Sequence, residues 1–169
     1  MAAIAYVGLG SNLDHPRRHL AKALAELARL PRTGLIDASR NYASEPLGSS
    51  LPQPDYVNAV VALRTSLTPA GLLDRLRAIE RRHGRRRRVG DPRNAPRTLD
   101  LDLLLFGRRR LRRAELTLPH PRMHERAFVL VPLLEIAPAV TIPGRGSARR
   151  WLRRVRGQRV VRTRTHAWH

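Results

Sequence analysis

Two aspartates, Asp100 and Asp102, lie in a segment whose polar and apolar residues alternate. From Thr98 to Leu103 this alternation has the period of a β-strand with one buried face, so both carboxylates project from the same side. Side chains at positions i and i+2 of a strand are roughly 6.6 Å apart. Two like charges at that spacing favour a cation, and Mg²⁺ commonly takes one or two carboxylates together with substrate phosphates. A pair of such ions about 3.5–4 Å apart can clamp a phosphoryl group during its transfer.

Arginines accompany this pair of carboxylates. Arg97 directly precedes the strand, and a run of arginines occupies positions 85–88. The planar guanidinium fork suits bidentate binding of phosphate oxygens. The aspartate spacing alone favours an ordinary half-exposed strand whose acidic face is solvated or neutralised by Arg97. With the arginines included, the better interpretation is a site for transfer of a polyphosphate group.

A second patch pairs an aromatic ring with a carboxamide. Tyr56 and Asn58 fall on the same side of a predicted strand. Such a pair can stack on a flat heterocycle and read its edge by hydrogen bonds. A core tyrosine next to a turn asparagine fits the same pattern equally well.

A third patch centres on His120, which lies between two prolines and is therefore restrained in its backbone. This histidine could donate to a phosphate, act as an acid or base, or be a plain surface residue. Arg126 and Phe128 follow, and they suit one phosphate contact and one stacking face, or simply surface and core positions.

The hydrophobic pattern predicts the elements that must hold these patches. In chain order they are a strand over 4–9, a helix opened by Asp14 and Pro16, strands over 35–42 and 57–65, a helix capped by Thr68 that runs to Gly84, and a strand from residue 98. Downstream, residues 122–135 and 148–155 have helical patterns. The order β-α-β-β-α-β predicts a ferredoxin-like antiparallel sheet with helices packed on it. Gly8-Leu9-Gly10 lacks the third glycine of a dinucleotide fingerprint, and we set that motif aside.

Length and composition predict one α/β domain over residues 1–150, followed by a basic tail over 151–169. A chain of 169 residues with 42% hydrophobic residues can bury a substantial core. The absence of cysteine excludes a disulfide framework and a thiolate metal site. No basic signal-peptide segment opens the sequence, and no apolar run approaches membrane-spanning length. We therefore expect a soluble cytoplasmic protein without a membrane partner.

The charge is strongly basic but uneven. The net charge is +20, which normally indicates a polyanionic partner such as nucleic acid. Lys22 is the only lysine among 33 basic residues, and the others are arginines. Our hypothesis is that this excess of arginine over lysine partly reflects the base composition of the coding sequence. A basic nucleic-acid-binding module on a ferredoxin-like sheet is the alternative function. Aromatic residues are few and no aromatic-rich RNA-binding strand is present, so we do not expect nucleic acid as a partner.

Together these motifs resemble the hydroxymethyldihydropterin pyrophosphokinase family. The matching segments are Tyr6-Val7-Gly8-Leu9-Gly10-Ser11-Asn12, Gln53-Pro54-Asp55-Tyr56-Val57-Asn58, Pro96-Arg97-Thr98-Leu99-Asp100-Leu101-Asp102, Pro119-His120-Pro121-Arg122, and two segments over 126–130 and 132–138. The resemblance covers about residues 3–140. It implies the ferredoxin-like fold and transfer of the β,γ-pyrophosphoryl group of ATP to the hydroxymethyl group of the pterin, with release of AMP.

The resemblance also implies a role for individual residues. Asp100 and Asp102 would hold two Mg²⁺ ions against the ATP phosphates, and Arg85 and Arg97 would act with them in catalysis by binding or steering those phosphates. Further ATP contacts would come from Arg87, Leu103 and His120. Pterin contacts would come from Ser44, Leu47, Tyr56, Asn58, Arg126 and Phe128. The expected partners are thus the small molecules ATP and hydroxymethyldihydropterin, bound by a monomer.

Overall fold

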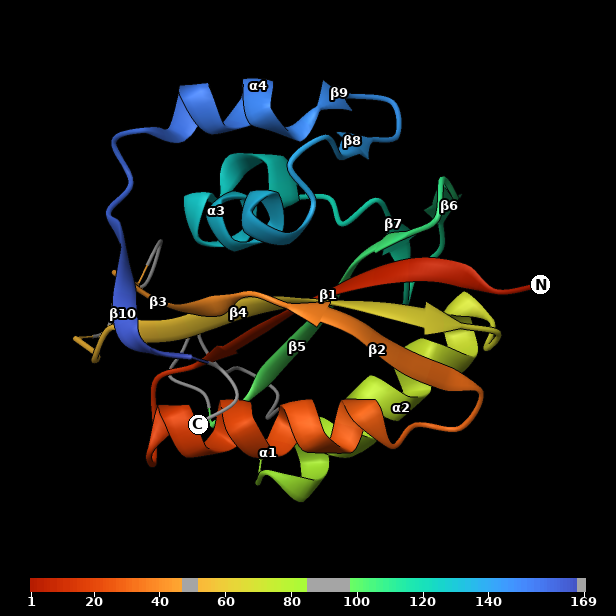
Figure 1. The fold of residues 1–169 in the computed structure, drawn as a ribbon, viewed down its shortest axis with the longest axis horizontal. Helices are drawn as coiled ribbons and strands as arrows, with labels where there is room; N and C mark the ends of the chain where they lie inside the picture. Colours follow the sequence, from red (N-terminus) through yellow and green to blue (C-terminus); the bar gives the residue numbers. More distant parts are fainter. Residues whose placement is uncertain (47–51, 85–97, 167–169) are drawn as a thin grey trace.

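A six-stranded antiparallel sheet lies between two layers of helices (Figure 1). The computed structural model describes residues 1–46, 52–84 and 98–166. Residues 164–166 are described by their backbone alone. The elements are β1 (Ala3–Ser11), α1 (Pro16–Ala28), β2 (Thr33–Ala38), β3 (Arg40–Ser44), β4 (Tyr56–Thr65), α2 (Pro69–Arg82), β5 (Asp100–Phe106), β6 (Leu111–Arg112), β7 (Thr117–Leu118), η1 (Met123–Glu125), α3 (Ala127–Ile136), β8 (Thr141–Ile142), β9 (Gly146–Ser147), α4 (Ala148–Leu152), η2 (Arg153–Val155) and β10 (Val160–His166).

The sheet has the strand order β10-β3-β4-β1-β5, and β2 pairs with the other half of β4. β2 and β3 are separated only by Ser39. Its backbone N–H donates to the Val60 carbonyl and its hydroxyl accepts from the Val60 N–H, each at 2.9 Å. These two short strands therefore stand where the sequence predicts one strand over 35–42. Apart from β10, the arrangement is the predicted ferredoxin-like one, and this prediction is confirmed.

The core on one side of the sheet is formed with α1 and α2. Leu20, Leu24 and Leu27 recur along one face of α1 and are buried against the sheet. α2 starts as predicted, because the Thr68 hydroxyl accepts the Gly71 N–H at 3.0 Å. The start of α1 differs from the prediction: His15 precedes the helix with a φ of 62°, and no side chain caps it.

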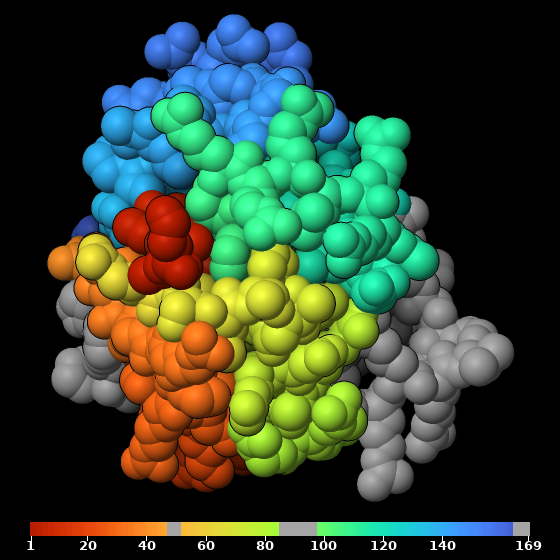
Figure 2. Space-filling model, turned by 90° about the vertical axis from the view of Figure 1, so that its right-hand side faces the viewer, coloured from red at the N-terminus to blue at the C-terminus, as the bar shows by residue number. Residues whose placement is uncertain are grey.

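The core on the other side is formed with α3, and α4 packs on α3. Val60, Leu104 and Leu130 are buried there. A short 3-10 turn, η1, occupies 123–125, so α3 begins at Ala127 and not at 122. Figure 2 shows α2, the β6–β7 hairpin and the C-terminal layer reaching the surface one above another on one side of the molecule.

The C-terminal region differs from the predicted tail. A boundary at residue 150 would cut through α4, and β10 pairs with β3 as a further strand of the sheet. The β-branched residues of 160–165 suit a strand, and their pairing satisfies backbone groups that β3 would otherwise expose at an edge. Within the described residues, no helix has the length and apolar character needed to cross a membrane.

Candidate active site

Two glycines of β1 open a hollow on the α3 side of the sheet. Gly10 lies opposite Asp100 of β5 and also opposite Asn58 of β4, while Gly8 lies opposite Asp102. A Cβ atom placed on Gly10 would lie 3.4 Å from the Asn58 side-chain oxygen. β1 lies between β4 and β5. Because its two glycines have no side chain, β1 leaves space between the carboxylates of β5 and the carboxamide of β4.

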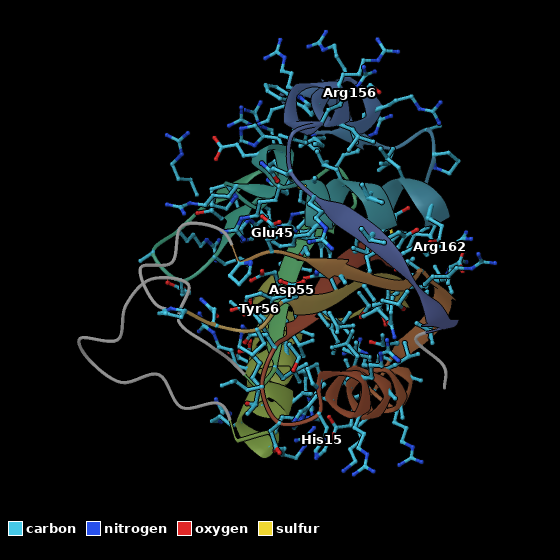
Figure 3. The ribbon with its side chains drawn as sticks, turned by 90° about the vertical axis from the view of Figure 1, so that its left-hand side faces the viewer. His15, Glu45, Asp55, Tyr56, Arg156 and Arg162 are labelled. Atoms are coloured by element: carbon cyan, nitrogen blue, oxygen red, sulfur yellow. The ribbon has the colours of Figure 1, made fainter. Side chains whose placement is uncertain are left out.

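This space is a cavity of about 230 Å³ between the sheet and the segment Arg122–Val129. It brings together the predicted residues Ser44, Tyr56, Asn58, Asp100, Asp102, Arg126 and Phe128. Figure 3 labels Tyr56, together with Glu45, which also lines the cavity, beside the ribbon of β5. Residues far apart in the sequence thus converge on one site.

Asn58 presents a defined hydrogen-bonding edge to the cavity. Its side chain is buried, and its Nδ2 donates to the Ser44 Oγ at 2.7 Å and to the Tyr42 carbonyl at 3.4 Å. A backbone carbonyl can only accept, which places the nitrogen on that side and turns the oxygen toward Gly10. Asn58 can therefore accept a hydrogen bond from the edge of a flat ligand.

The opposite wall carries an aromatic ring beside a cation. The Arg126 guanidinium carbon lies 5.5 Å from the centre of the Phe128 ring, within cation–π range. Both side chains are half-buried and line the cavity. This wall offers a stacking face next to a group that can bind phosphate.

His120 reaches Asp102 from the loop after β7. Its Nε2 lies 3.8 Å from the Asp102 Oδ1, and its Nδ1 accepts the Arg122 backbone N–H at 3.2 Å. The ring proton therefore sits on Nε2, on the side of the carboxylate. Burial lowers the pKa of His120 to about 4, with Arg126 adding to this effect and Asp100 opposing it. At neutral pH the imidazole is therefore uncharged, and its Nε2–H is available as a hydrogen-bond donor.

The two aspartates fit a hard divalent cation. Both are half-buried carboxylates on one face of β5, at the cavity wall. Nowhere in the described ranges do three or more His, Cys, Asp or Glu side chains gather as a complete metal site. A pair of carboxylates does not suit a structural Zn²⁺ site, in which protein side chains supply all the ligands. It suits Mg²⁺, which completes its coordination with phosphate oxygens and water.

Leu103 can reach a ligand only through its backbone. Its side chain is buried in the core, and β5 ends the strand order of the sheet at this side. The Leu101 N–H points outward from that edge, where it donates to the Glu80 carboxylate at 2.9 Å. Residues i and i+2 of a strand turn their backbone groups to the same side, and the pairing with β1 stays in register from Leu101 to Leu103, so the Leu103 N–H points outward as well.

The remaining predicted site residues lie outside the described residues. They are Leu47, Arg85, Arg87 and Arg97. Conversely, sequence reasoning missed nine cavity-lining residues: Gly8, Leu9, Gly10, Glu45, Ala59, Val60, Arg122, Glu125 and Val129. The two glycines could have been found from the alternation of β1, where small residues on one face predict a hollow in the sheet.

Comparison with known proteins identifies the family. A sequence model of the 7,8-dihydro-6-hydroxymethylpterin-pyrophosphokinase (HPPK) family matches residues 6–138. The chain is 51% identical over 138 residues to the 2-amino-4-hydroxy-6-hydroxymethyldihydropteridine pyrophosphokinase of Pseudomonas aeruginosa, covering 82% of this chain and 83% of the relative. The enzyme of the same name from Haemophilus influenzae is 48% identical over 141 residues, covering 82% and 84%. The chain therefore belongs to the HPPK family, as its motifs indicate.

Solved structures share the fold. An HPPK-DHPS crystal structure in complex with substrates superposes with a TM-score of 0.67 at 13% identity and covers 91% of this chain. Plasmodium falciparum HPPK-DHPS with pterin and p-hydroxybenzoate gives a TM-score of 0.68 at 14% identity, again covering 91%. The present chain spans 43% of the length of each of these chains. This likeness therefore concerns the fold of one part of those proteins.

Proposed function

We propose that the cavity binds 6-hydroxymethyl-7,8-dihydropterin beside ATP, and that the β,γ-pyrophosphoryl group passes to the pterin hydroxymethyl group with release of AMP. Membership of the HPPK family makes the chain a pyrophosphokinase of folate biosynthesis with ATP as co-substrate. One observation carries the detailed assignment. Gly10 separates Asp100 from Asn58 within a single cavity, so a phosphate-side group and a ring-reading group face each other at the width of one strand.

The pterin would occupy the Asn58 side of the cavity. Tyr56 and Phe128 come from opposite walls and would stack on the two faces of the ring. The Asn58 oxygen would accept from a ring-edge N–H, while Ser44 holds the carboxamide in place. We keep Leu47 as a further proposed pterin contact.

The phosphates would lie against β5 and His120. Asp100 and Asp102 would hold two Mg²⁺ ions, which would supply positive charge against the phosphate oxygens. The His120 Nε2–H would donate to a phosphate oxygen, and the outward backbone of Leu103 would contact ATP. Arg126 would lie near the junction of the pterin and the phosphates. Arg85, Arg87 and Arg97 remain proposed phosphate ligands, with Arg85 and Arg97 catalytic.

Positioning carries the reaction in this proposal. The pterin hydroxyl oxygen forms a bond to the β-phosphorus and gives up its proton to water, while the bond from the β-phosphorus to the oxygen that bridges it to the α-phosphorus breaks, and that oxygen leaves with AMP. Such a transfer depends chiefly on in-line alignment and charge neutralisation. His120 does not serve as the base, because one ring nitrogen already accepts the Arg122 N–H and the other carries the proton.

We also propose that the enzyme is a cytoplasmic monomer. The cavity is lined from both sides by a single chain, so a second copy is not needed to complete it. Consumption of ATP fits the cytoplasm, where ATP is made available to biosynthetic enzymes. Light scattering of the purified protein with and without ATP tests the monomer.

Product analysis tests the proposed reaction. Purified protein is incubated with ATP, Mg²⁺ and hydroxymethyldihydropterin, and the nucleotides are separated. We expect AMP that depends on the pterin and disappears when the metal is chelated. Formation of ADP would indicate an ordinary kinase on this scaffold. If no nucleotide is consumed, steeply salt-dependent binding of nucleic acid would favour the alternative function instead.

A further inference from the structure

A glutamine from the C-terminal region holds the wall that carries Arg126. The Gln158 Oε1 accepts the Ala127 backbone N–H at 2.8 Å, and its Nε2 donates to the Glu125 carbonyl at 2.8 Å. Its carboxamide thus bonds to the main chain on both sides of Arg126. Gln158 lies beyond the residues 6–138 that match the family.

These two bonds give the Ala127 N–H and the Glu125 carbonyl a partner from a distant part of the sequence. No side chain within the sequence around Arg126 caps the first turn of α3. The Ala127 N–H is one of the helix-start donors that need an outside partner, and Gln158 supplies it. Arg126 itself has an extended backbone, with φ −122° and ψ 107°. Its own N–H donates to the Met123 carbonyl at 3.4 Å and its carbonyl accepts the Leu130 N–H at 3.0 Å, so Gln158 adds support on both sides of a locally bonded residue.

Gln158 is itself fixed from both directions along the chain. Its backbone N–H donates to the Val155 carbonyl at 3.0 Å. Two residues later, β10 begins with Val160 opposite Ser44, the residue that bonds Asn58. The short segment from Val155 to Val160 therefore connects the end of β3 at one side of the cavity with the start of α3 at the other.

We propose that Gln158 is a positioning residue for pterin binding, fixing the main chain of Glu125–Ala127 so that Arg126 and Phe128 face the substrate. This rests on the proposed function, because the pterin is the ligand that these two side chains would contact. Gln158 does not line the cavity itself, and it acts through the main chain that it bonds.

Two variants separate positioning from stability. Gln158→Leu removes both hydrogen bonds at similar size. Gln158→Glu keeps an acceptor for the Ala127 N–H, where a negative charge at a helix start is favourable, but it loses the donor to the Glu125 carbonyl. Arg156→Ala is the matched control, since Arg156 is exposed in the same segment and lies on the outer C-terminal layer in Figure 3, away from Tyr56.

Binding of 6-hydroxymethylpterin is measured by calorimetry with Mg²⁺ and a non-hydrolysable ATP analogue present, and thermal melting is recorded in parallel. We expect both Gln158 variants to weaken pterin binding about tenfold, which corresponds to about 1.4 kcal/mol. We expect affinity for the ATP analogue to change less than about twofold, and Gln158→Glu to melt close to the wild type.

Unchanged pterin affinity in both variants would overturn the proposal. Loss of affinity in Gln158→Leu alone, in step with a lower melting temperature, would show a purely structural role and overturn it too. Formation of AMP by the wild type shows whether the positioning proposal alone has failed or the proposed function has failed as well. A wild type that makes AMP beside Gln158 variants of normal pterin affinity refutes positioning alone, whereas a wild type that makes no AMP refutes the function.

Discussion

The two walls of the cavity are built in different ways. On the sheet side, Gly10 pairs with Asp100 on one strand and with Asn58 on another, so the strand register places the floor residues. On the other side, Arg126 and Phe128 lie where a 3-10 turn meets the start of a helix. Their main chain is held by bonds within this segment and by the two that the Gln158 side chain makes.

This difference matches what each wall has to do. Metal coordination and edge recognition depend on distances of a few tenths of an ångström, and these groups lie on hydrogen-bonded strands whose opposite face is packed in the core. Stacking and a long guanidinium tolerate small shifts. We therefore expect substitutions in the sheet wall to abolish or redirect chemistry, and changes in the helix wall to weaken binding by degrees.

The largest effect is expected at the sheet wall, with Asp102→Ala. Removal of a metal ligand should lower the rate of transfer on the order of 10³-fold, because stabilisation of the phosphate charge is lost. Pterin affinity should stay close to that of the wild type, because the ring-binding side of the cavity is intact. Rate assays and calorimetry check both points. Asp74→Ala, which removes an exposed acid on α2, serves as the control. An active Asp102→Ala enzyme would refute the metal assignment.

A smaller effect on the same wall is expected with Asn58→Ala. Loss of the buried carboxamide should weaken pterin binding about tenfold or more while leaving ATP binding nearly unchanged. Ser44→Ala is the matched variant, because it removes the acceptor of the Asn58 Nδ2 and leaves the oxygen that faces Gly10. We expect its effect to be the smaller of the two. Calorimetry in which Asn58→Ala weakens ATP more than pterin would contradict the assigned role.

The sequence was sufficient for the polar and aromatic side chains of the sheet wall, though not for Gly8 and Gly10, because the signals for those side chains are local. Alternation over 98–103 places Asp100 and Asp102 on one face, and the same period places Tyr56 with Asn58. The structure finds each of these side chains at the cavity. Hydrophobic spacing and the Thr68 cap likewise predicted the β-α-β-β-α-β order, which the structure confirms except that β2 and β3 replace the single strand predicted over 35–42.

The sequence predicts Arg126 and Phe128 of the helix wall as site residues, but the bonds from Gln158 that hold this wall could not be predicted, because they are remote in the sequence. Gln158 and Ala127 are 31 positions apart, and no local pattern joins them. The arginines of 160–166 concealed a strand whose β-branched residues pair with β3. The start of α1 was also not predictable from local pattern, since Asp14 does not cap the helix. Asp14 and His15 both have positive φ, and the Asp14 Oδ2 lies 3.5 Å from the His19 Nε2.

A pair of histidines behind the sheet wall, of which His83 is buried, provides a test by pH. His83 at the end of α2 has its Nδ1 2.7 Å from the Nδ1 of His19, and its Nε2 lies 3.0 Å from the Glu26 carboxylate. Burial lowers the pKa of His83, with Glu26 opposing this effect and His19 and Lys22 adding to it. Of the remaining charged groups here, Arg82 lies 3.7 Å from Glu26.

The sign of the effect follows from that lowered pKa. The unfolded chain takes up the proton at a higher pH than the folded chain, so this contribution to stability is complete above about pH 6.5 and is lost as the pH falls. We expect His83→Gln to reduce the slope of unfolding free energy against pH by less than about 1.4 kcal/mol per pH unit, the limit for one proton. Denaturant unfolding between about pH 5 and 7 measures it. An unchanged slope would contradict the assignment to His83.

The smallest expected effect lies outside both walls, with Thr68→Ala at the start of α2. Loss of the acceptor for the Gly71 N–H should lower the free energy of unfolding by about 1 kcal/mol. Thr68→Ser keeps the hydroxyl and should lie close to the wild type. Because Thr68 is exposed and does not line the cavity, the dissociation constants of pterin and ATP should not change. If the constants shift with Thr68→Ala, general destabilisation reaches the cavity, and losses of affinity at either wall no longer report on that wall alone.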